Sequence, residues 1–449
     1  MKALLCRGAE STTAMHLAVD DTDSRDGMCT TYLLAKMITE MPFDLIGLPR
    51  LVRLNPAVPW KTRGNGALAM RLGVGGGEPQ RIGSAAEDVM CYPRLRREVS
   101  ADEVMEWALP YVREHMQAGS NPGIVVSRTK PPQRLYWQGA RDILSIDEVT
   151  RTLDGMGALR HGEGDGRGIV GASCAMAWRP RDRSLELLAY RQEERWGSIR
   201  HLDVSTVERL DALYPSTFNN IERRWMKAAI MPSTPCPVLY GIRGEDLPDL
   251  LSAKEMLETE DPGIWMVFLS NQGSDDHVIE DPAELLPNRS YRLGLSVSSP
   301  SRDEKGGHVI IRARRGSEEL ECAAYEPSKE FRNLLRLLRP GDAIDAIGEL
   351  REEPRTLNLE KVLVKSLADS QVKAANPRCP RCGRAAKSVG KGAGYRCRPC
   401  SVHLPEGAAP ALREQRLLVP GWYEPPVCSR RHLSKPLCRM GEEQPLDFV

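Results

Sequence analysis

The sequence has no apolar stretch near the roughly 20 residues that a membrane-spanning helix requires. Its opening, MKALLCRGAE, holds one lysine and an apolar run too short for the core of a signal peptide. The formal net charge is only +1, so the chain as a whole lacks the basic excess that would indicate a nucleic-acid partner. These absences predict a protein of the reducing cytoplasm that is not held by a membrane.

Two common ligand-binding motifs are missing as well. No G-x-x-x-x-G-K-[ST] phosphate loop occurs in the sequence. A calcium loop that started at Asp21 would have Arg25 at its fifth position, glycine at its seventh and Tyr32 at its twelfth, which excludes that motif. The acidic residues of this stretch therefore need another explanation.

The length of 449 residues is enough for about three or four domains. We expect an N-terminal extension (1–14), a first domain (15–145), a second domain that could interleave with the first (146–285), a small β-barrel (286–368) and a C-terminal region (372–449). Overall, a multidomain α+β protein is predicted.

Five regularly spaced runs with strand character follow residue 290, and one amphipathic helix (329–338) falls between the third and the fourth. Five strands with a helix before the fourth is the order of an OB-fold, a barrel that often binds single-stranded nucleic acid. The alternative is a generic small β-barrel without a ligand, since a fold alone does not determine function. The five runs are 291–297, 308–313, 318–324, 343–350 and 356–364.

Four of the 12 cysteines form two Cys-x-x-Cys pairs, Cys379 with Cys382 and Cys397 with Cys400. Four thiolates in two close pairs can surround one Zn²⁺ tetrahedrally and leave no open position, which predicts a structural site. A redox role is the weaker interpretation, because glycine, lysine and arginine surround the pairs instead of a thioredoxin-like strand and helix.

The C-terminal region is basic, with 14 Lys/Arg against 3 Asp/Glu in residues 371–440, a net charge of +11. Arg430, Arg431, Lys435 and Arg439 cluster near its end. Together with the zinc ribbon they predict a surface that contacts nucleic-acid phosphates. The alternative is a solvated charged tail.

The stretch VDDTDSRDGMCTTYLL places Asp20, Asp21 and Asp23 after an apolar run (15–19) that we expect to form a strand. Crowded carboxylates at a strand end are typical of a Mg²⁺ site, in which the ion bridges to substrate phosphates. Thr30 and Thr31 begin the next expected helix, where a hydroxyl could cap the helix, touch a phosphate or accept one. An Asx-turn followed by a threonine N-cap is an equally good interpretation of this segment alone.

Two glycine loops could complete a nucleotide site. The first, NPAVPWKTRGNGALA, places Lys61 and Arg63 beside Gly64 and Gly66, so that cationic side chains and backbone donors converge on an anion.

The second loop, GEGDGRGIVGA, enters a probable helix and carries Asp165 and Arg167, which could face a ligand. An acid cluster with a metal beside basic glycine loops is what phosphoryl transfer requires, so the three stretches together indicate an ATP-binding site.

Further motifs occur in a familiar order, including PRLVRLNPAVPWKTRGNGALA, TFNN, PVLYGIRG, SNQGSDDH, AAYEPSKEFR and WYEPPVCSRRHLSKPL. With them, the chain from residue 15 to about 439 resembles the archaeal agmatidine synthetases, or tRNA(isoleucine) 2-agmatinylcytidine synthetases. The resemblance implies a kinase-like domain, a ferredoxin-like domain, an OB-fold and a zinc ribbon.

The resemblance also implies a reaction. ATP would activate the C2 carbonyl of the wobble cytidine in the CAU-anticodon isoleucine tRNA, and the primary amine of agmatine would displace the activated oxygen. ATP would end as AMP and phosphate, and the modified tRNA would read AUA codons. The implied cofactors are ATP, Mg²⁺ and Zn²⁺, the implied partners are the tRNA and agmatine, and no obligate protein partner is implied.

By position, the resemblance assigns roles to the candidate residues. Asp20, Asp21 and Asp23 would hold Mg²⁺ and the triphosphate, and Thr30 matches a threonine that the enzyme phosphorylates on itself. Lys61, Arg63, Gly64 and Gly66 would meet phosphates or the activated base, and Asp165 and Arg167 would contribute to the ATP or agmatine pocket.

Two rival functions remain open. A non-catalytic RNA-binding protein would explain the barrel and the ribbon but leaves the three acidic and glycine-rich stretches without a purpose. A metal-dependent nuclease would use the aspartates to activate water, but it does not explain the threonines that follow them.

Overall fold

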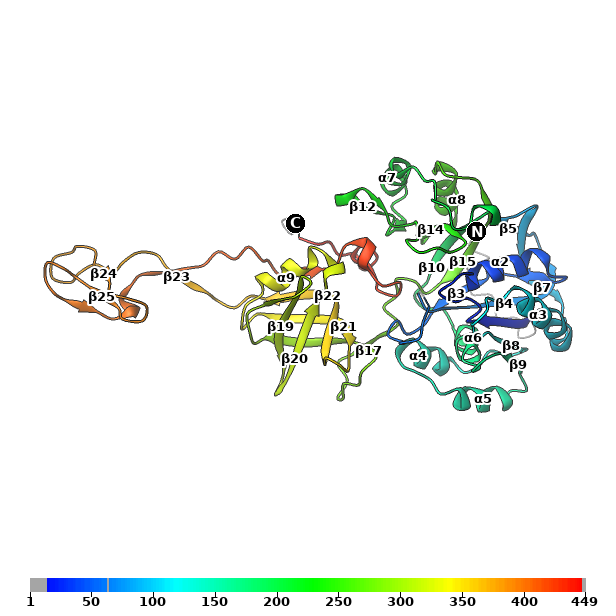
Figure 1. The fold of residues 1–449 in the computed structure, drawn as a ribbon, viewed down its shortest axis with the longest axis horizontal. Coiled ribbons are helices and arrows are strands. Elements are labelled where there is room, and N and C mark those ends of the chain that lie inside the picture. The colour runs from blue at the N-terminus through cyan, green and yellow to red at the C-terminus, as the bar shows by residue number, and fades with distance from the viewer. Residues whose placement is uncertain (1–13, 63, 446–449) are drawn as a thin grey trace.

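The computed structural model describes residues 14–62 and 64–445 of the chain, which form a mixed α+β protein. Figure 1 shows three bodies in a row along the longest axis: a large sheet with its helices, a central barrel, and a small ribbon at the far end. Within the described residues, no helix is both long enough and apolar enough to cross a membrane.

One sheet of 13 strands is built from strands between Met15 and Ser270, so the first two expected domains share a single sheet. Strand β3 joins the two halves, because it pairs antiparallel with β4 and parallel with β15. The strands are β1 (Met15–Asp20), β2 (Asp44–Ile46), β3 (Arg50–Arg53), β4 (Gly66–Gly76), β5 (Gln80–Ser84), β6 (Asp88–Tyr92), β7 (Arg94–Arg97), β8 (Gly123–Ser127), β9 (Leu159–Gly162), β10 (Ser184–Arg191), β11 (Thr217–Phe218), β14 (Val238–Gly244) and β15 (Pro262–Ser270).

Seven helices pack around this sheet within the described residues. They are α2 (Thr30–Glu40), α3 (Ala101–His115), α4 (Gln133–Arg141), α5 (Ile146–Asp154), α6 (Gly168–Ala177), α7 (Val204–Leu213) and α8 (Leu247–Met256). A separate hairpin, β12 (Ile221–Glu222) and β13 (Lys227–Ala228), follows α7.

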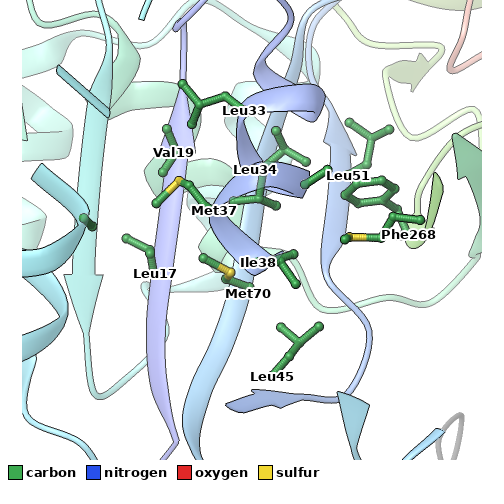
Figure 2. Packing of buried hydrophobic residues seen from close by; sticks show 14 of the residues in the cluster. Leu17, Val19, Leu33, Leu34, Met37, Ile38, Leu45, Leu51, Met70 and Phe268 are labelled. Atoms are coloured by element: carbon green, nitrogen blue, oxygen red, sulfur yellow. The ribbon is translucent and has the colours of Figure 1, made fainter. Parts of the chain in front are cut away.

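Helix α2 packs its apolar face on the centre of the sheet. Leu33, Leu34, Met37 and Ile38 are buried and lie at the spacing expected for one helix face. Figure 2 shows these side chains over Leu17 and Val19 of β1 and beside side chains of β3, β4 and β15. The expected strand and helix are thus confirmed, and the packing fixes the turn between them, which carries the aspartates.

The central body is a closed, barrel-like sheet, as the five regular strand runs predicted. Strand β17 pairs with both β21 and β19, while β22 pairs with β21 and β20, so the sheet returns on itself. The elements are β16 (Val278–Glu280), β17 (Arg289–Val297), β18 (Arg302–Glu304), β19 (His308–Arg315), β20 (Glu318–Ala324), α9 (Phe331–Leu337), β21 (Ala343–Leu350) and β22 (Thr356–Ser366).

The chain then leaves the barrel and comes back. Strands β23 (Gln371–Lys373) and β27 (Ala411–Arg413) pair as a two-stranded connection that carries the ribbon of β24 (Lys387–Ser388), β25 (Tyr395–Arg396) and β26 (His403–Leu404). Strand β28 (Gly421–Tyr423) then pairs with β22 of the barrel. The remaining chain, with η5 (Val427–Ser429) and α10 (Leu437–Met440), lies between the barrel and the large sheet (Figure 1).

Candidate functional site

A cavity of about 620 Å³ lies where the large sheet meets the hairpin and the returning C-terminal segment. Its wall is made by the end of β1, the start of α2, the loop before β4, the start of α6, strands β10 and β14, and residues 427–432. The candidate residues that line it are Asp20, Asp21, Asp23, Thr30, Lys61, Gly64, Gly66 and Arg167. Stretches that are far apart in the sequence thus meet at one space.

The acidic end of this cavity is the turn after β1. Asp20 ends the strand, and Asp21 adopts a left-handed conformation with φ of 55°. Burial, and then the charge of Asp21, raises the pKa of Asp20 well above its ordinary value. Burial and the neighbouring Asp23 raise the pKa of Asp21 to about 6. These carboxylates therefore need protons or a cation in order to coexist.

These aspartates could supply only part of the ligands of a metal ion. Within the described residues, only four cysteines bring three or more possible ligand atoms within 4.8 Å of one another. Asp20, Asp21 and Asp23 would therefore share an ion through waters and substrate oxygens and would not enclose it. Mg²⁺ binds in that way, keeping several waters and taking one or two carboxylates.

Helix α6 approaches the acidic end very closely. A Cβ atom on Gly171 would lie 1.7 Å from Oδ2 of Asp20, so no other residue type fits there without moving the aspartate. The close packing of α6 against Asp20 thus explains why the sequence GIVGA has a glycine at position 171.

Threonine hydroxyls surround the third aspartate. Thr30 Oγ1 donates to Asp23 Oδ1 at 3.3 Å and accepts from the Thr22 backbone N–H at 3.4 Å. Thr62 Oγ1 contacts the same carboxylate at 3.4 Å. The N-cap of α2 is Cys29, whose side chain makes no capping bond. The threonine N-cap is therefore wrong, and Thr30 points toward the aspartates.

The basic glycine loop lies across the cavity wall. Lys61 donates through Nζ to the carbonyl of Pro56, and burial, followed by the charge of Arg431, lowers its pKa. Gly64 packs against the His432 ring, 2.6 Å from the place where a Cβ would stand. Arg63 lies outside the described residues.

Of the two candidate residues in the second glycine loop, only Arg167 lines the cavity. The Arg167 guanidinium lies 4.9 Å from the centroid of the Trp60 ring, and Trp60 also lines the cavity. Asp165 pairs with Arg167 and is not among the described residues that line the cavity. Its charge also helps to raise the pKa of Asp21.

Sequence reasoning missed a buried polar group on the opposite half of the sheet. Glu186 of β10 is 1% exposed and pairs with Arg53 of β3 and Arg243 of β14, and all three line the cavity. The available signal was the single acidic residue within the apolar strand LELLAYR. His432, another missed residue, lies in the terminal basic motif.

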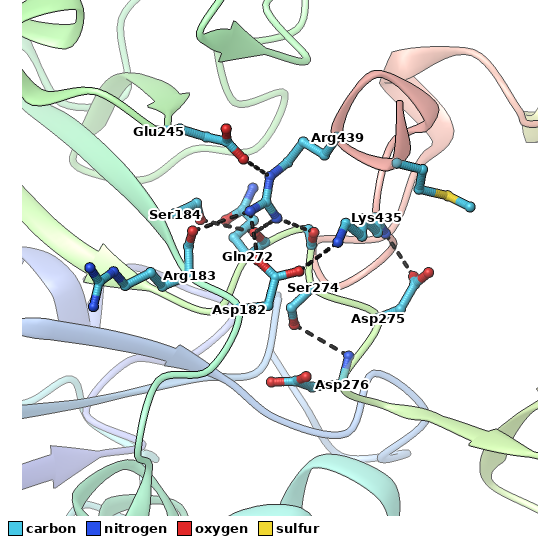
Figure 3. Close-up of polar contacts among 12 residues, drawn as sticks. Asp182, Arg183, Ser184, Glu245, Gln272, Ser274, Asp275, Asp276, Lys435 and Arg439 are labelled. Atoms are coloured by element: carbon cyan, nitrogen blue, oxygen red, sulfur yellow. Dashed lines mark hydrogen bonds and ion pairs between the residues drawn. The ribbon is translucent and has the colours of Figure 1, made fainter. Parts of the chain in front are cut away.

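The four cations expected to form part of a basic surface near the C-terminus are paired with acidic residues, whereas the basic surface of the ribbon stays a prediction. Arg439 binds Asp182 and Glu245, each at 2.7 Å, and Lys435 binds Asp182 at 2.7 Å (Figure 3).

The two preceding arginines are paired in the same way. Arg430 pairs with Glu424 at 2.8 Å, and Arg431 pairs with Glu349 and Glu360 of the barrel. We call residues 427–440 the strap, because their ion pairs connect the large sheet to the barrel. The strap also places Arg430, Arg431 and His432 in the cavity wall.

The ribbon carries the predicted metal centre. The sulfur atoms of Cys379, Cys382, Cys397 and Cys400 all lie within 4.8 Å of one another, and Cys379 and Cys397 are buried. Four converging thiol groups fit a tetrahedral Zn²⁺ with no open position, so the site is structural.

Comparison with known proteins places these features in one family. Profiles of the TiaS TCKD domain, the TiaS FLD domain and the TiaS C-terminal zinc ribbon domain match residues 16–164, 166–277 and 376–409. The chain is 39% identical over 439 residues to the isoleucine tRNA 2-agmatinylcytidine synthetase TiaS of Archaeoglobus fulgidus, covering 95% of this chain and 98% of that protein. It is 37% identical to the protein of the same name from Methanosarcina mazei, with 95% and 97% covered.

Solved structures agree over nearly the whole chain. A crystal structure of TiaS in complex with its isoleucine tRNA and ATP matches with a TM-score of 0.83 and 36% identity, covering 97% of this chain and 100% of that one. A complex of TiaS with the same tRNA, AMPCPP and agmatine matches with a TM-score of 0.79 and 34% identity, again covering 97% and 100%. The chain therefore belongs to the TiaS family, the isoleucine tRNA 2-agmatinylcytidine synthetases.

Proposed function

We propose that this protein uses ATP to join agmatine to C2 of the wobble cytidine of the CAU-anticodon isoleucine tRNA, giving agmatidine so that AUA codons are read. The family supports the activity, and relatives were solved with an isoleucine tRNA, ATP or AMPCPP, and agmatine. The observation that carries the proposal is the single cavity in which the acidic turn, the threonines and both glycine loops meet.

The reaction needs activation because a carbonyl oxygen on a pyrimidine is a poor leaving group. Phosphorylation of the C2 oxygen converts that oxygen into part of a phosphate. The amine of agmatine then attacks C2 and loses a proton, and phosphate departs with the oxygen. One difficult substitution is thereby split into two feasible steps, and the phosphoryl group given to the base leaves as one phosphate. For ATP to end as AMP, a second phosphoryl group must also leave it and pass finally to water, so that two phosphates are released.

The residues of the cavity fit these steps. Asp20, Asp21 and Asp23 would hold Mg²⁺, which when bound neutralises the phosphate charge. Lys61 and Arg167, with Gly64 and Gly66, would contact phosphates or the activated base.

Thr30 is the candidate for autophosphorylation. Its hydroxyl lies 3.3 Å from an Asp23 oxygen, and Asp23 lines the same cavity as the other candidate phosphate-binding residues. An oxygen held there can accept a phosphoryl group from a nucleotide bound at the aspartates.

The domain identities belong to the same proposal. We assign the first domain a kinase-like role in ATP binding, and the second a ferredoxin-like fold that shares its sheet. The pairing of the barrel strands, in the order β17, β19, β20, β22, β21 and back to β17, supports the OB-fold assignment.

Purified protein incubated with ATP, Mg²⁺, labelled agmatine and the CAU-anticodon tRNA tests this function. We expect ATP-dependent transfer of label to one cytidine, and loss of transfer in Asp20→Ala. Tight tRNA binding without any transfer would support a binding protein instead, and cleavage of the tRNA chain would support a nuclease.

A further inference from the structure

Three buried groups on the large sheet form a charge cluster that the proposed reaction has not used. Arg53 Nη2 lies 3.3 Å from Glu186 Oε2, and Arg243 Nε lies 3.2 Å from Glu186 Oε1. The arginine side chains are 12% and 14% exposed, and that of the glutamate is 1% exposed. Two guanidinium groups thus share one carboxylate.

No second acid balances this cluster within the described residues. Glu186 is the one acidic residue that acts on Arg243, and the charge of Arg53 together with burial lowers the Arg243 pKa. The adjacent His432 stays neutral and adds no further positive charge, because the charges of Arg53 and Arg243 keep its pKa well below the ordinary value. The cluster therefore retains one net positive charge.

A buried excess charge is costly unless something pairs with it. Hydrogen-bond donors also remain available at this place. Arg53 Nε is buried without a partner, and among the guanidinium nitrogens of Arg243 only Nε makes a hydrogen bond within the described residues. Both arginines line the 620 Å³ cavity, so the missing anion can enter from there.

The neighbouring groups hold the arginines in place. Gln272, with its amide oriented to suit both neighbours, donates to Glu186 Oε2 at 2.8 Å and accepts from Arg243 Nε. Arg53 Nη1 lies 2.9 Å from where a Cβ of Gly64 would stand, so the glycine leaves room for the guanidinium. The donors are therefore preorganised on rigid strands, which favours binding of an anion with several acceptor oxygens.

We propose that Arg53 and Arg243 form a phosphate-binding subsite of the cavity, with Glu186 limiting its net charge to one. The inference rests on the proposed function, in which two of the three substrates, the tRNA and the nucleotide, carry phosphate. The phosphate comes either from the tRNA backbone beside the target nucleotide or from the nucleotide. Neither arginine pairs with an aspartate of the acidic turn, so the subsite is distinct from the proposed metal site.

Two binding measurements on the full-length protein distinguish the sources. The first is the dissociation constant for the CAU-anticodon tRNA as a function of KCl concentration, and the second is that for AMPCPP with Mg²⁺ in the absence of tRNA. The variants are Arg243→Gln, Arg53→Gln and Glu186→Gln. Arg81→Gln is the matched control, since Arg81 is a strand arginine of the same sheet that pairs with Asp88 outside the cavity.

If the tRNA supplies the phosphate, either arginine variant should flatten the slope of log Kd against log salt by about 0.7, the value for one phosphate of a single strand. If the nucleotide supplies it, the AMPCPP dissociation constant should rise about tenfold, since one charge-assisted hydrogen bond is lost. Glu186→Gln adds one net positive charge to the cluster. It should therefore steepen the salt slope if the tRNA supplies the phosphate, or lower the AMPCPP dissociation constant if the nucleotide supplies it.

The proposal would be overturned if both arginine variants kept the wild-type salt dependence of tRNA binding and the wild-type affinity for AMPCPP. It would also be overturned by a Glu186→Gln variant that raises the KM for agmatine while phosphate binding stays unchanged, because Glu186 would then bind a cation. Agmatine transfer by the wild-type protein, measured alongside, separates this inference from the proposed function. If the wild-type protein transfers agmatine and the arginine variants bind tRNA and AMPCPP normally, the subsite alone is refuted. If the variants show altered binding but the wild-type protein transfers no agmatine, the proposed function alone is refuted.

Discussion

Gly171 faces the Asp20 carboxylate across the gap between α6 and the end of β1. A Cβ at Gly171 would lie only 1.7 Å from Oδ2 of Asp20, so any side chain there must displace the carboxylate or the helix. Because a displacement of about 1 Å can reduce catalysis roughly a hundredfold, we expect Gly171→Ala to lower agmatine transfer by at least that factor.

The matched control is Gly155→Ala at the end of α5. A Cβ there would meet its nearest neighbours at an ordinary 3.6 Å, so activity should stay near the wild-type rate. Steady-state transfer kinetics of both variants provide the comparison, and an active Gly171→Ala enzyme would show that Asp20 does not need its present position.

Thr30 is the hydroxyl that we expect to receive a phosphoryl group. Its Oγ1 contacts Asp23, whereas Thr31 Oγ1 lies 3.0 Å from Cys29 Sγ. With ATP labelled at the γ-phosphate, Thr30→Ala should lose protein-bound label and most agmatine transfer, while Thr31→Ala should keep the label. Retention of label in Thr30→Ala would assign the modification to another residue, of which Thr62 is the nearest alternative at the same carboxylate.

At the scale of elements, the strap is held to the barrel by a buried carboxylate. Burial alone would raise the pKa of Glu360, but His277 and Arg431 outweigh it and lower that pKa to about 2. A carboxyl whose pKa falls on folding stabilises the folded state above its ordinary pKa of 4.5, and this stabilisation is lost as the pH falls toward 2. The shift corresponds to about 3 kcal/mol.

We therefore expect the wild-type protein to exceed Glu360→Gln in unfolding free energy by about 3 kcal/mol at pH 7, with the difference shrinking as the pH falls from 4.5 to 2. Urea unfolding at a series of pH values measures this difference. Glu304→Gln is the control, because Glu304 is 45% exposed and pairs at the surface. A difference between wild type and Glu360→Gln that does not change with pH would contradict the assigned role of Glu360.

The sequence predicted elements wherever a local pattern decides the structure. The five regularly spaced runs with strand character located the barrel strands. The helical spacing of Leu33, Leu34, Met37 and Ile38 located α2, and cysteine spacing located the metal centre.

The pairing of the strap could not be predicted in that way. Arg439 forms ion pairs with Asp182 and Glu245, which are about two hundred residues away in the sequence. The sequence alone therefore gave no sign that its charge is paired. For the same reason Glu186 looked like an ordinary polar position in a strand, and only the sheet topology brings Arg53 and Arg243 to its two sides.

At the scale of the whole molecule, the ribbon is joined to the barrel by the paired strands β23 and β27 (Figure 1). Zinc binding should contribute to the folding of the ribbon alone, since apo sites of this kind do not fold. Replacing Cys382 with serine, or removing zinc with a chelator, should therefore weaken tRNA binding while AMPCPP binding stays at the wild-type level. Both dissociation constants can be measured on the same preparation.

Cys438→Ser serves as the control for that experiment. Cys438 is exposed and lies outside both the metal cluster and the lining of the cavity. A Cys382→Ser protein that bound tRNA as tightly as the control would remove the ribbon from the proposed recognition of the tRNA.

The cavity itself is a property of the whole molecule that sequence patterns could indicate only in part. The acidic turn and the glycine loops were visible as separate motifs, and their convergence follows from the sharing of one sheet. The contribution of the strap was not visible, because residues 427–432 reach the cavity only after the chain has gone out to the ribbon and returned.

The most direct measurement is a crystal structure of this protein with AMPCPP and Mn²⁺ in place of Mg²⁺, with the metal located by its anomalous scattering. The proposed site predicts a metal peak beside Asp20, Asp21 and Asp23, with the triphosphate extending from it into the cavity toward the glycine loops. A nucleotide bound elsewhere, or an acidic turn without metal while the nucleotide is present, would contradict it.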